Sequence, residues 1–246
     1  MSESDDMSHE NQWKRVYLLG GAATLMVLLG AVLDVVVGSY LGGNLSALPQ
    51  TAVDRFAQFQ SDPLLGLYNL DLLNTVNQIV LIPAYVALYA AQRQSSPAFS
   101  LLALVIFLVG TTVFVSTNTA LPMLDLSERY AAAATESQKM LFAAAGEGLL
   151  ARGTHGSLGV FIGFLLPNLA GLAMAYGMFT GKVFGKATAL AGLIGSALIV
   201  LYLVLVTFVP AVRQMATAAA LPGGLLLMAW MSLFAVRLFQ LSRPRG

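Results

Sequence analysis

Polar side chains follow one face of an apolar segment that runs from Leu64 to about Ala91. At about 100° per residue, they fall within roughly one third of the circumference of a helix. A membrane helix cannot turn such a face toward lipid, because unpaired polar groups in hydrocarbon are costly. The face is therefore predicted to meet other helices or water. Its members are Tyr68, Asp71, Asn74, Thr75, Gln78, Tyr85 and Tyr89.

Two acidic residues lie inside apolar segments. Asp71 is the costliest member of the polar face, since an aspartate at the centre of a membrane helix costs about 2.5–3.5 kcal/mol to insert. Asp34 lies in the first apolar segment, with Gly30 four residues before it and Gly38 four residues after it. Small residues at this spacing let another helix approach closely, so we expect Asp34 at a helix–helix contact. The helical rise per residue places both acids in the outer half of the membrane.

These acids allow two interpretations, and the sequence leaves both open. They could form a proton, cation or substrate site, or they could be hydrogen-bonded groups that join helices and are kept neutral by burial. The first interpretation predicts a cavity that is reached from the outer side of the membrane. The candidate ligand-binding or proton site comprises Asp71, Asn74, Gln78, Asp34 and Tyr68.

Other chemistries find little support. The chain has no cysteine and only two histidines, His9 and His155, so thiolate chemistry is excluded and a histidine-rich metal site is hard to build. His155 with Glu147 is a weak pair, for which a capping or interfacial role is favoured. Phosphate-binding glycine loops and the H-E-x-x-H and G-x-S-x-G motifs are absent. We therefore predict no catalytic residue, no metal and no cofactor.

The composition identifies the kind of fold that must position these residues. Of 246 residues, 57% are hydrophobic and 10% are charged, whereas soluble domains have about 25% charged residues. Six segments reach the roughly 20 apolar residues that cross a bilayer. We predict an all-α polytopic integral membrane protein, a bundle of six transmembrane helices. The segments are Val16 to about Tyr40, Leu64 to about Ala91, Ala98 to about Ala120, Gly156–Phe179, Ala187–Val209 and about Ala218–Leu238.

Basic residues predict the orientation. The polar residues 1–12 are expected to be a disordered cytoplasmic tail, and residues 13–246 a single transmembrane domain. The positive-inside rule places both termini in the cytoplasm. Because the net charge is only +1, no nucleic-acid partner is expected. Eight basic residues lie on the side of the termini (Lys14, Arg15, Arg93, Lys182, Lys186, Arg237, Arg243 and Arg245), against five on the other (Arg55, Arg129, Lys139, Arg152 and Arg213).

Two outer connections are predicted to be structured. Thr51 and Asp54 have the spacing of a capping box, which predicts a short helix with Val53, Phe56 and Ala57 on its apolar face. The connection of about residues 121–155 contains a second helix start at Thr135, and its weak apolar face is expected to be Met140, Leu141, Ala144 and Leu149.

Three stretches resemble one protein family. They are Leu70-Asp-Leu-Leu-Asn-Thr-Val-Asn-Gln78, the segment from Ser116 to Ala131 and the segment from Ala144 to Leu150. In these stretches the chain resembles the domain of unknown function 4386, an uncharacterised family of bacterial six-helix membrane proteins. The resemblance implies the six-helix fold and a bacterial inner-membrane setting. It implies no activity and no catalytic residue.

Three functions are compatible with this sequence. We expect a non-enzymatic multi-pass membrane protein whose outward-facing polar pocket binds a small or lipid-like ligand, or an accessory subunit with a membrane protein partner. The alternative is a small transporter or proton-coupled carrier that uses Asp71. A membrane-embedded hydrolase is the third, and it is disfavoured by the missing nucleophile motifs.

Overall fold

The computed structural model describes residues 3–40, 49–153 and 158–243, and every regular element in these ranges is a helix. Within them, six helical segments are long and apolar enough to cross a membrane, in agreement with the predicted all-α bundle. The segments are Gln12–Val37, Leu72–Gln92, Pro97–Ala131, Glu136–Thr180, Lys186–Phe208 and Ala220–Ser242.

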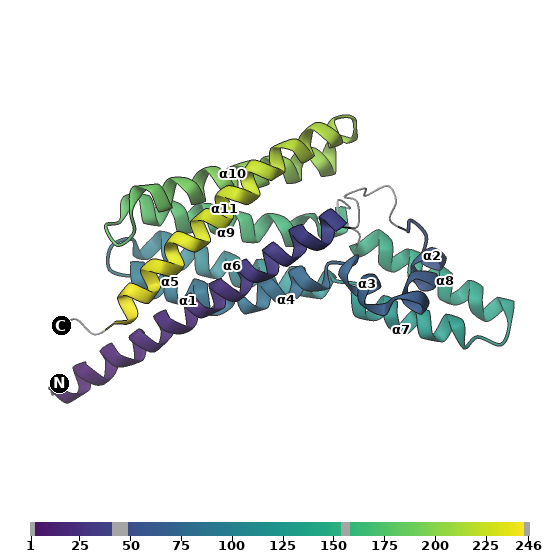
Figure 1. Cartoon of the computed structure of the whole chain (residues 1–246), viewed down its shortest axis with the longest axis horizontal. Coiled ribbons are helices and arrows are strands. Elements are labelled where there is room, and N and C mark those ends of the chain that lie inside the picture. The colour runs from purple at the N-terminus through teal and green to yellow at the C-terminus, as the bar shows by residue number, and fades with distance from the viewer. Residues whose placement is uncertain (1–2, 41–48, 154–157, 244–246) are drawn as a thin grey trace.

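The six membrane helices are arranged in a ring whose order follows the order of the helices in the sequence. Each span packs against the one before it and the one after it, and the last helix returns to pack against the first. Both termini consequently lie at one end of the bundle (Figure 1). The spans are formed by α1 (Glu3–Tyr40), α4 (Leu72–Val80) with α5 (Ile82–Gln92), α6 (Pro97–Thr117), α9 (Leu158–Thr180), α10 (Lys186–Phe208) and α11 (Arg213–Ser242).

The centre of the bundle is aromatic and closely packed. Tyr85 of α5 stacks on Phe107 of α6, with ring centroids 3.7 Å apart. Glycines allow neighbouring helices to approach this core. A Cβ atom at Gly110 of α6 would lie 2.7 Å from the Cβ of Leu166 in α9, and one at Gly163 would lie 3.1 Å from the Cα of Phe114. Gly163 therefore allows α9 to pack closely against α6.

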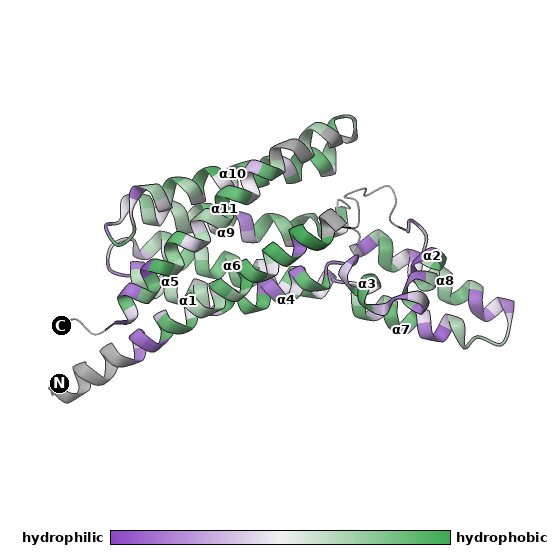
Figure 2. Cartoon of the chain, in the orientation of Figure 1, coloured by the Kyte–Doolittle hydropathy of each residue, from purple (hydrophilic) through white to green (hydrophobic). Residues whose placement is uncertain are grey.

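Four helices form a cap at the end of the bundle opposite the termini (Figure 1). Hydrophobic residues run along the membrane helices, whereas hydrophilic residues gather in the cap and near the termini (Figure 2). The cap helices are α2 (Ala52–Ser61), α3 (Pro63–Tyr68), α7 (Ala120–Ala131) and α8 (Glu136–Gly153). They enclose a second apolar core, which consists of Ala52, Phe56, Phe59, Leu70, Ala120, Met123 and Leu150.

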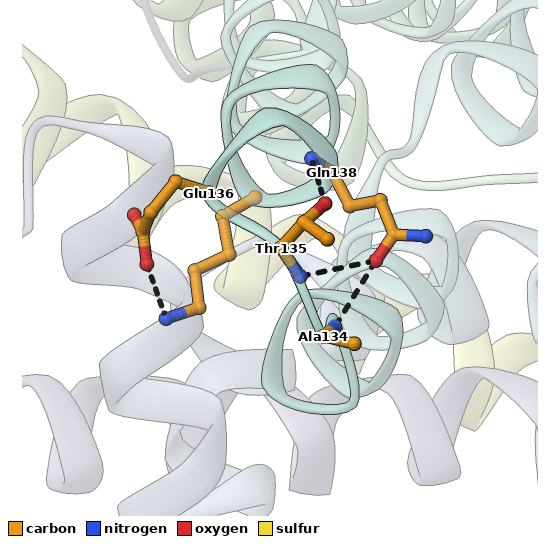
Figure 3. A network of polar contacts seen from close by, with 5 residues as sticks. Ala134, Thr135, Glu136 and Gln138 are labelled. Carbon is orange, nitrogen blue, oxygen red and sulfur yellow. Dashed lines mark hydrogen bonds and ion pairs between the residues drawn. The ribbon is translucent and has the colours of Figure 1, made fainter.

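Both predicted helix starts in the cap are confirmed. The hydroxyl of Thr51 accepts a hydrogen bond from the Asp54 backbone N–H at 3.2 Å and donates one to its carboxylate at 2.7 Å. At the start of α8, the Thr135 hydroxyl accepts from the Gln138 N–H at 3.2 Å. The Gln138 side chain in turn accepts from the N–H groups of Ala134 and Thr135 (Figure 3). These reciprocal bonds satisfy donors that the helix itself cannot satisfy.

The predicted apolar faces of both cap helices were correct only in part, since Phe56 of α2 is buried and Leu149 of α8 packs against the second apolar core. In α2, Val53 and Ala57 are exposed, and the buried residues are Ala52, Arg55, Phe56 and Phe59. In α8, Met140, Leu141 and Ala144 are exposed, and the helix instead buries Gly146, Leu150 and Gly153. The reason is close packing: a Cβ atom at Gly146 would lie 2.7 Å from the Cβ of Ala52. Gly146 therefore lets α8 approach α2 at the cap core.

The first and second apolar segments also differ from expectation. Residues 3–12, expected to be disordered, continue α1. Extending an existing helix carries no nucleation cost, and acidic residues near a helix N-terminus are favourable.

The segment expected to be one helix from Leu64 to Ala91 is divided into α3, α4 and α5. The first break lies at Asp71, and the second precedes Pro83, which cannot donate a backbone hydrogen bond.

Candidate functional site

Asp34 and Tyr68 form a direct hydrogen bond between the first membrane helix and the cap. The Tyr68 hydroxyl of α3 donates to Oδ1 of Asp34 in α1 at 2.9 Å, and it lies 3.1 Å from the Asp34 carbonyl oxygen. Burial raises the pKa of the Tyr68 phenol above its usual range, and the hydrogen bond to Asp34 adds to this effect. The raised pKa keeps the phenol protonated, and so able to donate this bond, to more alkaline pH than an ordinary tyrosine.

Asp71 lies at the break between α3 and α4 and has an unusual backbone conformation. Its φ of 61° and ψ of 25° place it in the left-handed region, and it is the one non-glycine residue with positive φ in the described parts of the chain. Aspartate tolerates this region better than most residues. The conformation turns the chain from α3 into the membrane, with the Asp71 side chain at the boundary between the cap and the bundle.

Hydrogen bonds on both sides hold the turn that contains Asp71. Its carboxylate Oδ1 accepts from the side-chain amide of Asn74 at 3.1 Å, and its carbonyl accepts from the N–H and the hydroxyl of Thr75, each at 3.0 Å. The side chain of Asn118, between α6 and α7, donates to the carbonyl of Leu70 at 2.8 Å. The turn is thereby attached to the third span as well as to its own helix.

Arg55 supplies a buried positive charge to the same region. Its residue is only 3% exposed, its Nη1 donates weakly to Gln58 at 3.4 Å, and its Nε has no hydrogen-bond partner among the described residues. Burial lowers the pKa of the guanidinium, and the negative charge of Asp71 opposes this shift. An arginine nevertheless stays protonated at neutral pH. The cap therefore places a fixed cation near the Asp71 carboxylate.

A small cavity lies beside Asp71. Its volume of about 10 Å³ leaves room for about one water molecule. Besides Asp71, it is lined by residues of the third span, the end of α8 and the fourth span, including Thr117, Asn118, Gly153 and Phe164. The cavity thus lies where the cap joins the bundle, between elements that are distant in the sequence.

The structure brings together four of the five candidate residues. Tyr68 is hydrogen-bonded to Asp34, and Asn74 is hydrogen-bonded to Asp71. The negative charge of Asp71 also acts on the phenol of Tyr68 and so links the two pairs. Gln78 lies two turns further along the second span, and its buried Oε1 has no hydrogen-bond partner within the described ranges. Sequence reasoning missed Arg55, although its spacing from Ala52, Phe56 and Phe59 is that of one helix face.

The close contact expected near Asp34 is present one turn earlier. A Cβ atom at Gly30 would lie 2.5 Å from Oδ1 of Asn77 in α4, so this glycine lets α1 and α4 pack together. Gly38 belongs to α1, but the contacts around it are not among those that the structure describes. Asn77 is not part of the predicted polar face, so the polar contacts between these two helices extend beyond that face.

Several other polar residues have structural roles. Glu147 of α8 accepts a hydrogen bond from the Ala52 N–H at 2.7 Å and so caps α2. Thr112, Ser116 and Thr117 donate to carbonyls of their own helix. His155 lies outside the described residues. Within the described ranges, no group of three or more histidine or acidic residues is placed to hold a metal ion.

The fold and this polar cluster define a multi-pass α-helical membrane protein with a helical cap at one end of the bundle. Comparisons with known protein families, with curated proteins and with solved structures find no match. The resemblance to the domain of unknown function 4386 therefore stays a prediction.

Proposed function

We propose that this chain is a non-enzymatic multi-pass protein of the bacterial inner membrane that binds a small or lipid-like ligand at the junction of cap and bundle. The binding residues are Asp71 and Asn74, with Asp34, Tyr68 and Gln78 on the neighbouring helix surfaces. In this proposal both termini are cytoplasmic and the cap faces outward, because eight of the thirteen basic residues lie on the side of the termini.

The observation that carries this proposal is the conformation of Asp71. Strained backbone in a residue other than glycine costs about 1–3 kcal/mol and is concentrated at functional sites. Here it holds a carboxylate beside a cavity at the start of the second membrane span, with the buried Arg55 nearby. The cavity has room for about one water molecule. A ligand larger than water therefore requires the elements that line the cavity to move apart.

A carrier that uses Asp71 is the second candidate. Transporters commonly bind substrates and coupling ions at interrupted membrane helices. The second span, Leu72–Gln92, begins directly after Asp71 and is interrupted before Pro83. This candidate predicts ion-dependent flux in proteoliposomes that Asp71→Asn abolishes. An accessory role predicts instead a stoichiometric membrane protein partner that co-purifies from native membranes.

Cysteine accessibility tests the proposed site. The chain contains no cysteine, so single cysteines introduced at Asp71, Asn74 and Gln78 can be labelled without background. A small water-soluble thiol reagent added from the cap side should modify position 71 fastest, 74 next and 78 slowest, since water reaches the site from the cap. A cysteine at Val76, which is exposed on the outer surface of the bundle, should react slowly because lipid covers it.

Equal protection of Asp71, Asn74 and Val76 would contradict a water-accessible site and leave Asp71 with a structural role. Reaction only from the side of the termini would contradict the outward-facing pocket and favour the carrier. A labelled cysteine at exposed Ser137 in the cap serves as the positive control.

A further inference from the structure

A second and much larger cavity lies at the other end of the bundle, where both termini are found. Its volume is about 970 Å³, and it opens between the start of α1, the end of α5, the α9–α10 turn and the end of α11. Four segments that are distant in the sequence therefore share its wall. Its lining residues Ala90 and Ala91 lie at the end of the second span, whereas Asp71 directly precedes the start of that span.

The wall of this cavity carries a concentrated positive charge. Five basic residues line it, and none of the described lining residues is acidic. Such a cluster creates a strong positive potential, which attracts an anion and is relieved when one binds. The five residues are Lys14, Arg93, Lys182, Arg237 and Arg243.

Two of the arginines are held in position. The Nε of Arg237 donates to the carbonyl of Val183 at 2.9 Å, and its Nη1 donates to the side chain of Gln240 at 3.2 Å. The guanidinium of Arg93 lies 4.3 Å from the ring centroid of Trp13. Fixed guanidinium groups suit phosphate oxygens, because they present several N–H donors in one plane. The wall is thus pre-organised for a phosphate group.

The position of the cavity identifies the source of that phosphate. It lies at the ends of the candidate spans Gln12–Val37, Leu72–Gln92 and Ala220–Ser242, which is the level of lipid head groups. Trp13 and Tyr17 also line it, and these residue types are enriched at the membrane interface. Ala90, Ala91 and Leu241 give this wall apolar parts as well.

We infer that this cavity binds the phosphate head group of an anionic phospholipid. Basic pockets between membrane helices are suited to such lipids, and five cations favour a lipid with two phosphates, such as cardiolipin, over one with a single phosphate. The inference does not rest on the Asp71 site, and either proposal can fail without the other.

Matched double variants of the full-length protein test this inference. Arg93→Gln with Arg237→Gln removes two charges from the wall. Arg15→Gln with Lys186→Gln removes two charges from the same end, at exposed residues that do not line the cavity. Lipid binding is measured by native mass spectrometry, with cardiolipin, phosphatidylglycerol and phosphatidylcholine as probes and inorganic phosphate in a separate arm.

The unmodified protein should bind cardiolipin most tightly and phosphatidylcholine least. Each basic residue near an anionic head group contributes about fivefold to binding, so the wall variant should lose roughly 30-fold in cardiolipin affinity and the control variant little. Equal loss in both variants, or no preference for anionic lipid in the unmodified protein, would overturn the inference. Saturation by millimolar phosphate without lipid would overturn the assignment to a lipid.

A third variant shows whether the glutamine variant loses lipid because it is inserted in the wrong orientation, since removing basic residues can alter topology. Arg93→Lys with Arg237→Lys keeps both charges but removes the guanidinium groups. It should bind cardiolipin with an affinity between those of the unmodified protein and the glutamine variant. If it binds as weakly as the glutamine variant while its Ser137→Cys derivative is still labelled from the cap side, charge in this wall does not hold the lipid and the inference fails.

Discussion

Replacing Asp71 with valine is expected to destabilise the purified protein by about 2–3 kcal/mol, whereas asparagine at the same position should be tolerated. Asp71 has a φ of 61°, and a side chain other than glycine, aspartate or asparagine loses about 1–2 kcal/mol in this region. Valine also removes the acceptor of the Asn74 hydrogen bond, which contributes about 0.5–1.5 kcal/mol. Asparagine keeps an acceptor oxygen and tolerates positive φ.

Thermal unfolding in detergent, followed by intrinsic fluorescence, measures this difference. Asp71→Gly is the informative third variant, because glycine has no steric cost at positive φ but lacks the acceptor. Its stability should lie between those of the asparagine and valine variants. Identical melting temperatures for valine and asparagine would show that the backbone at position 71 is not left-handed in the folded protein.

A methyl group added at Gly110 is expected to have the second large effect. The new Cβ atom would lie 2.7 Å from the Cβ of Leu166 and 3.0 Å from the backbone nitrogen of Pro167. Neither neighbour can move easily, since one is close to the backbone and the other belongs to a rigid ring. Overpacking of this kind costs about 1–3 kcal/mol, so Gly110→Ala should lower the melting temperature and Gly110→Leu should lower it further.

Gly224 of α11 provides the matched control for Gly110. It also lies inside a membrane helix, but no atom lies within 4 Å of the position of an added Cβ. Since alanine favours helix more than glycine does, Gly224→Ala should be neutral or slightly stabilising. Equal losses at both positions would mean that α6 and α9 are not in close contact at Gly110.

The membrane spans could be predicted from sequence because lipid restricts the possible structures. A span in hydrocarbon must satisfy every backbone group internally, so a long apolar segment is predicted to be a helix. The helix starts at Thr51 and Thr135 could be predicted for a similar reason, since their capping hydrogen bonds are local.

The cap and the candidate site were harder to predict because they depend on contacts between distant segments. Nothing local requires the chain to break at Asp71, where the turn is fixed partly by Asn118 from another helix. Arg55 has helical spacing with Phe56 and Phe59, but charged residues are almost never fully buried, so it was placed with the surface charges. The face of α8 was missed because its closest packing uses glycine, which carries no hydrophobic signal.

Labelling from the two sides of the membrane tests the arrangement of cap, spans and termini most directly. An impermeant thiol reagent should modify Ser137→Cys in the cap of intact cells. It should modify Gly185→Cys, where an added side chain meets no atom within 4 Å, only after the membrane is permeabilised. Labelling of both positions in intact cells would contradict a bundle that separates them, and the reverse pattern would contradict cytoplasmic termini.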